Sequence, residues 1–348
     1  MDDPIVDFHT HLPWRPRDSL EASRALLEAM DYAGVTLAVV INVEFAVTTF
    51  LENVSPRRII EAAAEVLDYL IVARIPYIHR IVMEPEWAVE EHVRFMRENH
   101  RDNVDFVRVA STGRLIPVAS FNPDLSVMDN LGRLRALGDR VLGVKVFPTL
   151  HFARPDSEKL RPVYDYVAGI NGVVVVHTGC DPGIWELPPF CSNAKPSYVA
   201  RAARENKDVR FIVAHLGAYS ALNPGIFFRE ALEALAVDNV YADTSAVDPY
   251  FARRAVEEVG YDKILFGSDY PMVQGLDIAS ALEDIMMLDI PGKAKRAIIT
   301  DNPLKLLKTW HGWEGVEKAL KLGRGEVVGM LEGELYINAD MISPWIKV

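Results

Sequence analysis

The chain has 348 residues, of which half are hydrophobic, a quarter are charged and 9% are aromatic. This is the composition of an ordinary globular protein, and the length allows one large α/β domain or two smaller ones. The formal net charge of −12 argues against a nucleic-acid partner or an anionic membrane surface. Apolar runs such as Leu37 to Ile41 are too short to span a bilayer.

The two cysteines, Cys180 and Cys191, make no disulfide framework and fit a reducing compartment. The N-terminal residues Met1-Asp2-Asp3-Pro4 lack both the basic start and the apolar core of a secretion signal. We therefore expect a soluble cytoplasmic protein.

A short apolar run that begins at Ile5 ends in two histidines, His9 and His11. Side chains two positions apart on a strand share a face, so both imidazoles would project together from the strand end. Neutral imidazole binds zinc and other first-row transition metals. The alternative for an isolated pair of this kind is two surface histidines beside a turn.

The rest of the chain alternates between strand-like and helical patterns. Strands are predicted at residues 35–43, 114–121, 141–147, 172–177, 209–215, 239–244 and 263–269. Helices are predicted at 19–32, 126–137, 158–169, 196–206, 227–236, 249–259, 278–287, 293–300 and 303–309. The second and third strands are separated by a long connection, with helices predicted at 56–69 and 85–99, each starting at a proline.

Eight strands alternating with helices predict an α/β fold of parallel βαβ units, a (β/α)8 TIM barrel with an extended connection between its second and third strands. A doubly wound open sheet is the alternative, disfavoured because no GxGxxG follows an early strand. The barrel is expected to occupy residues 1–310. Residues 311–348 are expected to form a C-terminal extension packed on the barrel, with a helix at 314–321 and a hairpin at 326–338.

Polar side chains end or interrupt several of these apolar strands, at the edge where a (β/α)8 barrel carries its active site. Burying so many polar groups without partners would cost several kcal/mol, a cost that a metal ion offsets by accepting their lone pairs. The residues concerned are His9, His11, Lys145, His177, His215 and Asp269.

Four motifs carry a family resemblance: Asp-Phe-His-Thr-His, Val-His-Thr-Gly, Ala-His-Leu-Gly and Phe-Gly-Ser-Asp-Tyr-Pro. Together they resemble the amidohydrolase superfamily, and within it the amidohydrolase-related (amidohydrolase 2) branch of aminocarboxymuconate-semialdehyde decarboxylase-like enzymes. The resemblance covers roughly residues 4 to 310. It implies that His9, His11, His177 and Asp269 surround one divalent metal ion, usually zinc, and that His215 is the catalytic acid/base or water-orienting histidine.

Two reactions fit this ligand set. The first is hydrolysis of a C–N or C–O bond in a small amide, lactone or ester, with Asp269 taking a proton from a metal-activated water. The second is non-oxidative decarboxylation of an unsaturated or aromatic acid. A catalytically inactive barrel that acts as a scaffold is the third hypothesis. The expected partner is a small-molecule substrate. Dimers are common in the family that the motifs resemble, and the tail or outer helices could form a homodimer here.

Other residues are candidates for substrate binding. Lys145 is the ambiguous one, with three roles open: binding a substrate anion or forming a salt bridge near the site, a metal-bridging carbamate as in two-metal amidohydrolases, and a structural ion pair. Trp185, Arg80 and His151 could line the pocket. The sequence places Arg80, Arg108 and Arg114 near the third strand, where an arginine could bind a substrate carboxylate. Asp7 is expected to orient a neighbouring group or the backbone.

Overall fold

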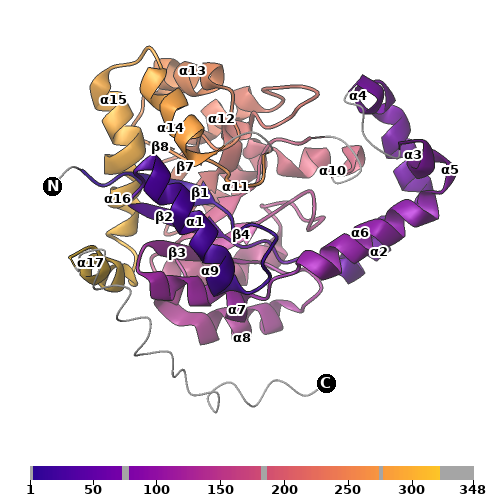
Figure 1. Ribbon diagram of the computed structural model, residues 1–348, viewed down its shortest axis with the longest axis horizontal. Coiled ribbons are helices and arrows are strands. Elements are labelled where there is room, and N and C mark those ends of the chain that lie inside the picture. Colours follow the sequence, from indigo (N-terminus) through magenta and orange to yellow (C-terminus); the bar gives the residue numbers. More distant parts are fainter. Residues whose placement is uncertain (1–2, 73–77, 182–185, 274–276, 322–348) are drawn as a thin grey trace.

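The computed structural model describes residues 3–72, 78–181, 186–273 and 277–321. Eight parallel strands occupy the centre, and most of the helices surround them (Figure 1). No helix within those ranges is long and apolar enough to cross a membrane.

The strands pair in chain order and form a nearly closed barrel. Two hydrogen bonds join its first strand to the chain that follows its last strand: the Phe8 N–H donates to the Phe266 carbonyl over 2.7 Å, and the Asp269 N–H to the His9 carbonyl over 2.8 Å. The predicted (β/α)8 barrel is confirmed. The strands are β1 (Val6–Thr10), β2 (Leu37–Ile41), β3 (Leu115–Ser120), β4 (Gly143–Val146), β5 (Val173–Val176), β6 (Arg210–Val213), β7 (Val240–Asp243) and β8 (Ile264–Leu265).

Some of the surrounding helices begin at capping side chains. Asp18 accepts a hydrogen bond from the Glu21 N–H, and Asp277 accepts one from the Ser280 N–H. The predicted helix at 293–300 is α15 followed by a π-helical turn, Ala297–Asp301. The helices are α1 (Ser19–Ala33), α8 (Val127–Leu137), α9 (Arg161–Gly169), α11 (Pro196–Glu205), α12 (Phe228–Leu235), α13 (Pro249–Val259), α14 (Ile278–Met287), α15 (Gly292–Arg296) and α16 (Asn302–Leu307).

Apolar side chains fill the barrel interior and seal one of its ends. Inward-facing residues such as Phe8, Val39 and Val175 pack against Leu307 of α16 and against Trp310. Val316 of α17 (Trp313–Lys321) joins the same cluster, so the first helix of the predicted extension packs on the barrel. The hairpin predicted at 326–338 lies outside the described residues. With this end closed by apolar packing, polar side chains inside the barrel gather at the other end.

A helical arm connects β2 to β3 and projects from the barrel (Figure 1). The arm has its own apolar core, which includes Phe50, Ile59, Ala62 and Met96. The helix predicted at 56–69 is divided into two, because Val66 at the end of α3 leaves the helical conformation. The helices of this connection are α2 (Val47–Asn53), α3 (Pro56–Glu65), α4 (Leu67–Val72), α5 (Ile78–Met83), α6 (Pro85–Asn99) and α7 (Asn103–Phe106).

The two cysteines correct the sequence analysis. Cys180 and Cys191 form a disulfide, with their Cα atoms 5.4 Å apart. Cys180 follows β5 and Cys191 ends the short helix α10 (Pro188–Cys191), so the chain turns back on itself between them. This return could not be predicted from two isolated cysteines, and the crosslink removes the cysteine-based argument for a reducing compartment.

Candidate metal centre

Every strand-end residue singled out from the sequence lies buried at the carboxyl-terminal mouth of the barrel. Each of these residues is at most 5% exposed: His9, His11, Lys145, His177, His215 and Asp269. This is the end where (β/α)8 enzymes carry their active sites.

Three of the predicted ligands form a compact set. The Nε2 atoms of His9 and His11 each lie 3.4 Å from Oδ1 of Asp269. Their Nδ1–H groups donate elsewhere, from His9 to Asp243 over 2.8 Å and from His11 to the Ile41 carbonyl over 2.9 Å. These hydrogen bonds fix the tautomer in which each Nε2 presents a lone pair toward the carboxylate.

The set fits a divalent metal ion. The buried Nε2 atoms of His9 and His177 make no hydrogen bond with any described residue. This is expected of nitrogen atoms that bind a metal ion. Burial alone would raise the pKa of Asp269, but its interactions with His11, His215 and His9 hold it well below its usual range. A carboxylate beside two imidazoles is a donor set that zinc binds. The amidohydrolase-type ligands predicted on strands one and eight are thus brought together.

His177 lies beside this trio, next to His215 and Glu186. Its Nδ1 is 3.0 Å from Nε2 of His215, and its Nε2 is 3.1 Å from Oε1 of Glu186. The ring of Phe147 stacks on the His177 imidazole at a centroid distance of 4.0 Å. The ligand atoms of His9, His11 and Asp269 all lie within 4.8 Å of one another, and His177 is not part of this set. Its role as the fourth ligand therefore stays a prediction.

His215 is held by hydrogen bonds from its backbone and its ring. Its Nδ1–H donates to the Ser245 carbonyl over 3.0 Å, and its backbone N–H donates to Asp243 over 3.0 Å. Burial lowers the pKa of His215 well below its usual value, so the imidazole is neutral near pH 7. Its Nε2 therefore carries a lone pair at the mouth of the barrel, as an acid/base residue requires.

Asp243 is a functional residue that the sequence analysis missed. One oxygen accepts from His9 Nδ1, and the other accepts from the backbone N–H groups of His215 and Ser245. It thereby orients a metal-ligand candidate and the catalytic candidate together. The signal was present in the sequence, because Tyr241-Ala242-Asp243 ends an apolar strand as the recognised residues do.

Asp243→Asn is expected to weaken metal binding about 10- to 100-fold while the fold is kept, because His9 loses the carboxylate that orients it. The affinity would be measured by competition with a chromophoric chelator. Asp156→Asn is the matched control, since Asp156 has a buried carboxylate that pairs with Arg154 and Arg201 away from the strand-end histidines. Wild-type affinity in Asp243→Asn would contradict the orienting role.

The backbone around the site is unusual. His215 and Asp269 have φ angles of 60° and 61°, in the left-handed region that residues other than glycine rarely adopt. Such outliers cluster at functional sites, where the surrounding structure holds them. Gly267 is required for another reason: a Cβ there would lie 2.7 Å from that of His9. The chain after β8 thus places Asp269 against β1.

Asp7 plays the orienting part expected of it. Its Oδ1 accepts hydrogen bonds from the backbone N–H groups of His9 and Ser268, each over 3.1 Å. It therefore ties β1 to the chain that carries Asp269. Burial raises the pKa of Asp7 to about 7.

Two of the residues predicted to bind substrate, Lys145 and His151, are buried in the structure. Lys145 on β4 is buried, and no described carboxylate lies within ion-pairing distance of its amine. Burial lowers its pKa to about 8, against the opposing charges of Asp243, Asp269 and Glu186. His151 is also buried, and its Nδ1 accepts a hydrogen bond from the Phe147 N–H.

The other two candidates are not brought to this cluster. Arg80 lies in α5 of the arm, where its guanidinium pairs with Glu84 and lies 4.1 Å from the centroid of the Trp87 ring. Trp185 lies outside the described residues. Their substrate-binding roles stay predictions.

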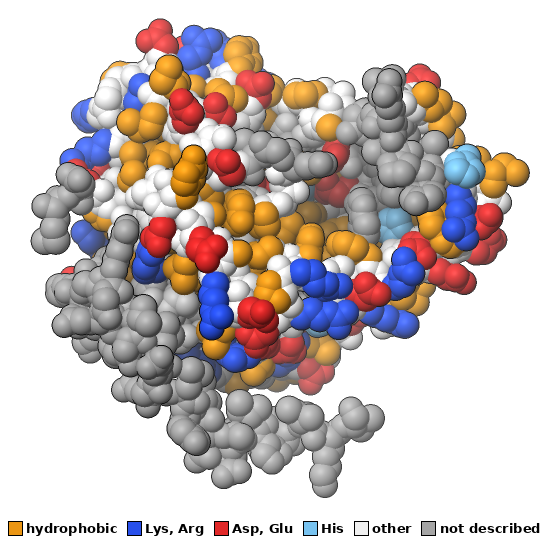
Figure 2. Space-filling model, viewed as in Figure 1, with side chains coloured by type: hydrophobic (Ala, Val, Ile, Leu, Met, Phe, Trp, Pro, Cys, Tyr) orange, Lys and Arg blue, Asp and Glu red, His pale blue; other side chains and the backbone are white. Residues whose placement is uncertain are grey.

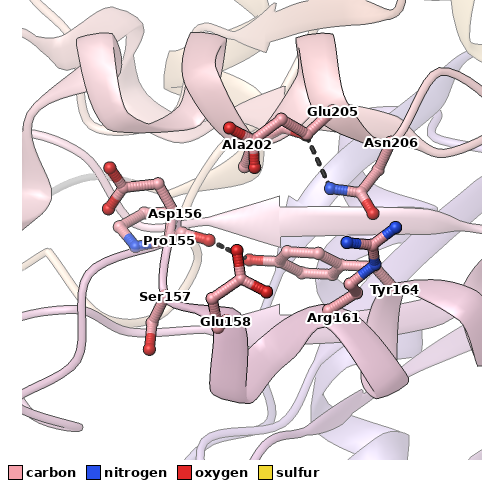
Figure 3. Close-up of a pocket in the computed structure, with 9 residues that line it drawn as sticks. All are labelled: Pro155, Asp156, Ser157, Glu158, Arg161, Tyr164, Ala202, Glu205 and Asn206. Atoms are coloured by element: carbon pink, nitrogen blue, oxygen red, sulfur yellow. Dashed lines mark hydrogen bonds between the residues drawn. The ribbon is translucent and has the colours of Figure 1, made fainter.

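The molecular surface is hollowed between the barrel and the arm, and hydrophobic side chains gather across this face (Figure 2). A separate small pocket lies between α9 and α11, lined by Asp156, Tyr164 and Asn206 among others (Figure 3). Two of its polar groups are already bonded, since the Tyr164 hydroxyl donates to the Pro155 carbonyl and the Asn206 amide to the Ala202 carbonyl. It contains none of the strand-end histidines and is not the chemical centre.

Comparison with known proteins agrees with this geometry. The sequence model of the amidohydrolase family (Amidohydro_2) matches residues 6–309. The chain belongs to the amidohydrolase family. It is therefore an enzyme of a metal-dependent family, and it contains a candidate ligand set for the metal. No curated protein matches the sequence.

Solved structures share the fold at low sequence identity. An uncharacterised TIM-barrel protein from Bordetella bronchiseptica has a TM-score of 0.60 at 16% identity, covering 88% of this chain and 99% of its own. A probable 2-pyrone-4,6-dicarboxylic acid hydrolase from Acinetobacter baumannii, with citric acid bound, has a TM-score of 0.55 at 14% identity (87% and 98% covered). A 2,6-dihydroxybenzoate decarboxylase from Rhizobium has a TM-score of 0.51 at 17% identity (88% and 99%). At these identities the likeness shows the fold alone.

Proposed function

We propose that this amidohydrolase-family enzyme hydrolyses a C–N or C–O bond of a small amide, lactone or ester. The observation that carries the proposal is the Asp269 carboxylate, held ionised between His9 and His11. A carboxylate in this position can hold a water molecule and accept its proton. When bound, a divalent ion, for which we propose zinc, would act as a Lewis acid and lower the pKa of that water.

The other steps of the proposed reaction are assigned to side chains of this protein. Asp269 takes the proton and His215, with its neutral ring fixed through Ser245, orients the substrate carbonyl or protonates the leaving atom. His9 and His11 would hold the metal, and Asp243 and the Ile41 carbonyl fix their rings. We propose His177 as the remaining ligand, since its buried Nε2 makes no hydrogen bond with a described residue, although Oε1 of Glu186 lies 3.1 Å from it.

Decarboxylation uses the same ligands but needs a cation to bind the substrate acid. The three arginines considered for that task are each paired with a protein carboxylate: Arg80 with Glu84, Arg108 with Asp105 and Asp18, and Arg114 with Asp31. This pairing favours hydrolysis. We also keep a cytoplasmic location as a proposal, supported by the composition but no longer by the cysteines.

A screen of the zinc-loaded protein on lactones, esters, amides and aromatic acids tests the proposal. Carboxylate formation and CO2 release would be followed in parallel. We expect acid formation from at least one neutral class without CO2. CO2 release from an aromatic acid, with no hydrolysis in the screen, would replace the hydrolase by the decarboxylase.

A further inference from the structure

We infer that Ser245 is a positioning residue, whose hydroxyl group holds the rings of His9 and His215 in one fixed arrangement. The part of this inference that concerns catalysis by His215 rests on the proposed hydrolytic function. Ser245 follows β7, two residues after Asp243, and its side chain is completely buried. The sequence analysis did not single it out.

The hydroxyl group of Ser245 makes three contacts. It donates a hydrogen bond to Oδ1 of Asp243, and its oxygen lies 3.0 Å from Nδ1 of His9 and 2.8 Å from Nδ1 of His215. A hydroxyl group has one proton to donate and two lone pairs that accept. Because the proton is directed at Asp243, the oxygen can accept from one N–H of each imidazole. The three contacts thus use the full hydrogen-bonding capacity of the group.

The two imidazoles lie on either side of this hydroxyl group. Their ring centroids are 5.0 Å apart, and their planes are tilted by 35°. Both rings meet Ser245 through Nδ1, which leaves Nε2 of each ring for the site. In His9 this atom lies 3.4 Å from Oδ1 of Asp269, and in His215 it lies 3.0 Å from Nδ1 of His177. One side chain therefore orients a metal-ligand candidate and the catalytic candidate relative to each other.

The backbone fixes the position of Ser245 itself. Its N–H donates to Oδ1 of Asp243 over 3.1 Å, the same atom that accepts from its hydroxyl group. The next residue, Ala246, has a φ angle of 52°, in the left-handed region that residues other than glycine rarely adopt. Gly267 leaves room beside both side chains, since a Cβ there would lie 2.7 Å from that of His9 and 3.1 Å from that of Ser245.

Removal of the hydroxyl group would leave each ring with a single acceptor for its Nδ1–H. His9 would keep Oδ2 of Asp243, and His215 would keep the backbone carbonyl of residue 245. The two rings would then no longer share a partner. Hydrogen-bond partners behind a metal ligand contribute about 10- to 100-fold to metal affinity, so the loss of one of two should cost about 10-fold.

The test compares Ser245→Ala with Ser23→Ala, at a buried serine of α1 whose hydroxyl donates to the Leu20 carbonyl. Zinc affinity would be measured by competition with a chromophoric chelator. The imidazole N–H signals of the metal-free protein would be recorded by NMR after ¹⁵N-histidine labelling and assigned by their loss from His9→Ala and His215→Asn. In Ser245→Ala zinc should bind about 10-fold more weakly, and the Nδ1–H protons of both rings should exchange faster with water. Ser23→Ala should change neither.

A double-mutant cycle with Asp243→Asn tests the coupling. Because the hydroxyl and the carboxylate belong to one network, the loss of zinc affinity in the double variant should be smaller than the product of the two single losses. Independent effects, an unchanged zinc affinity or a change confined to one ring would overturn the inference. If Ser245→Ala fails to fold, the wild-type spectrum decides, since an unprotonated Nδ1 on either ring would contradict its contact with the hydroxyl.

These measurements need no substrate, so they still decide the role of Ser245 if no lactone, ester or amide is hydrolysed and the proposed function fails. Where hydrolysis is observed, kcat at saturating zinc should fall about 10-fold in Ser245→Ala with KM unchanged, because His215 is no longer held against the bound substrate. An unchanged kcat would overturn the inference for His215 and leave the proposed hydrolysis standing.

Discussion

His9→Ala is expected to lose tight metal binding and to show only the activity of the metal-free protein, while keeping its fold. His9 supplies one of the two imidazoles directed at Asp269, and its Nε2 has no hydrogen-bond partner among the described residues that could replace a metal. The barrel interior that stabilises the fold lies below it, in the apolar cluster around Phe8 and Val39. Metal content by atomic emission, activity and circular dichroism would be measured on the same preparation.

His11→Ala should behave in the same way, because its Nε2 lies equally far from Asp269. His92→Ala is the matched control: His92 is a buried histidine of α6 in the arm, where its ring stacks on Phe50. It should keep the metal. If the metal-free His9 and His11 variants unfold at room temperature, the metal has a structural role and the catalytic assignment loses its main support.

His215→Asn is expected to keep the metal while kcat falls about 10²- to 10⁴-fold, the usual contribution of general acid–base catalysis. The imidazole lies 3.0 Å from His177 and is fixed by Ser245, but it is not one of the trio around Asp269. The wild-type pH–rate profile should be bell-shaped, and the variant should lose the limb that reports His215.

Asp269→Asn is the comparison, since it should weaken metal binding and catalysis together. Loss of metal from His215→Asn as complete as from His177→Asn would make His215 a ligand. Full metal content with a full rate would make it a structural residue of the barrel mouth, and the proposed mechanism would fail.

The features that could be predicted from sequence are those that follow from local periodicity. Alternating apolar runs and helical patterns indicated the eight-stranded barrel. The carboxyl ends of its parallel strands meet at one edge, independently of the conformation of the loops. His9, His11 and Asp269 could therefore be brought together without coordinates. Asp243 obeys the same rule, since it ends β7, but the sequence analysis did not single it out.

The remaining features depend on where long connections fold back, which no local pattern records. Glu186 and Cys191 follow β5 by several residues, and they reach His177 and Cys180 only because that segment packs on the arm. The sequence analysis placed Arg80 near the site because this residue precedes the third strand. The structure places it on the arm instead, paired with Glu84.

Metal titration of the metal-free protein is the most direct test of the central claim, a single metal centre built on His9, His11 and Asp269. Zinc would be added in steps while heat and hydrolytic activity are followed, and the mass of the intact chain would be recorded. We predict one tight equivalent per chain, activity that saturates at that equivalent, and an unmodified Lys145. Two tight equivalents with a carbamate on Lys145, or full activity without metal, would contradict it.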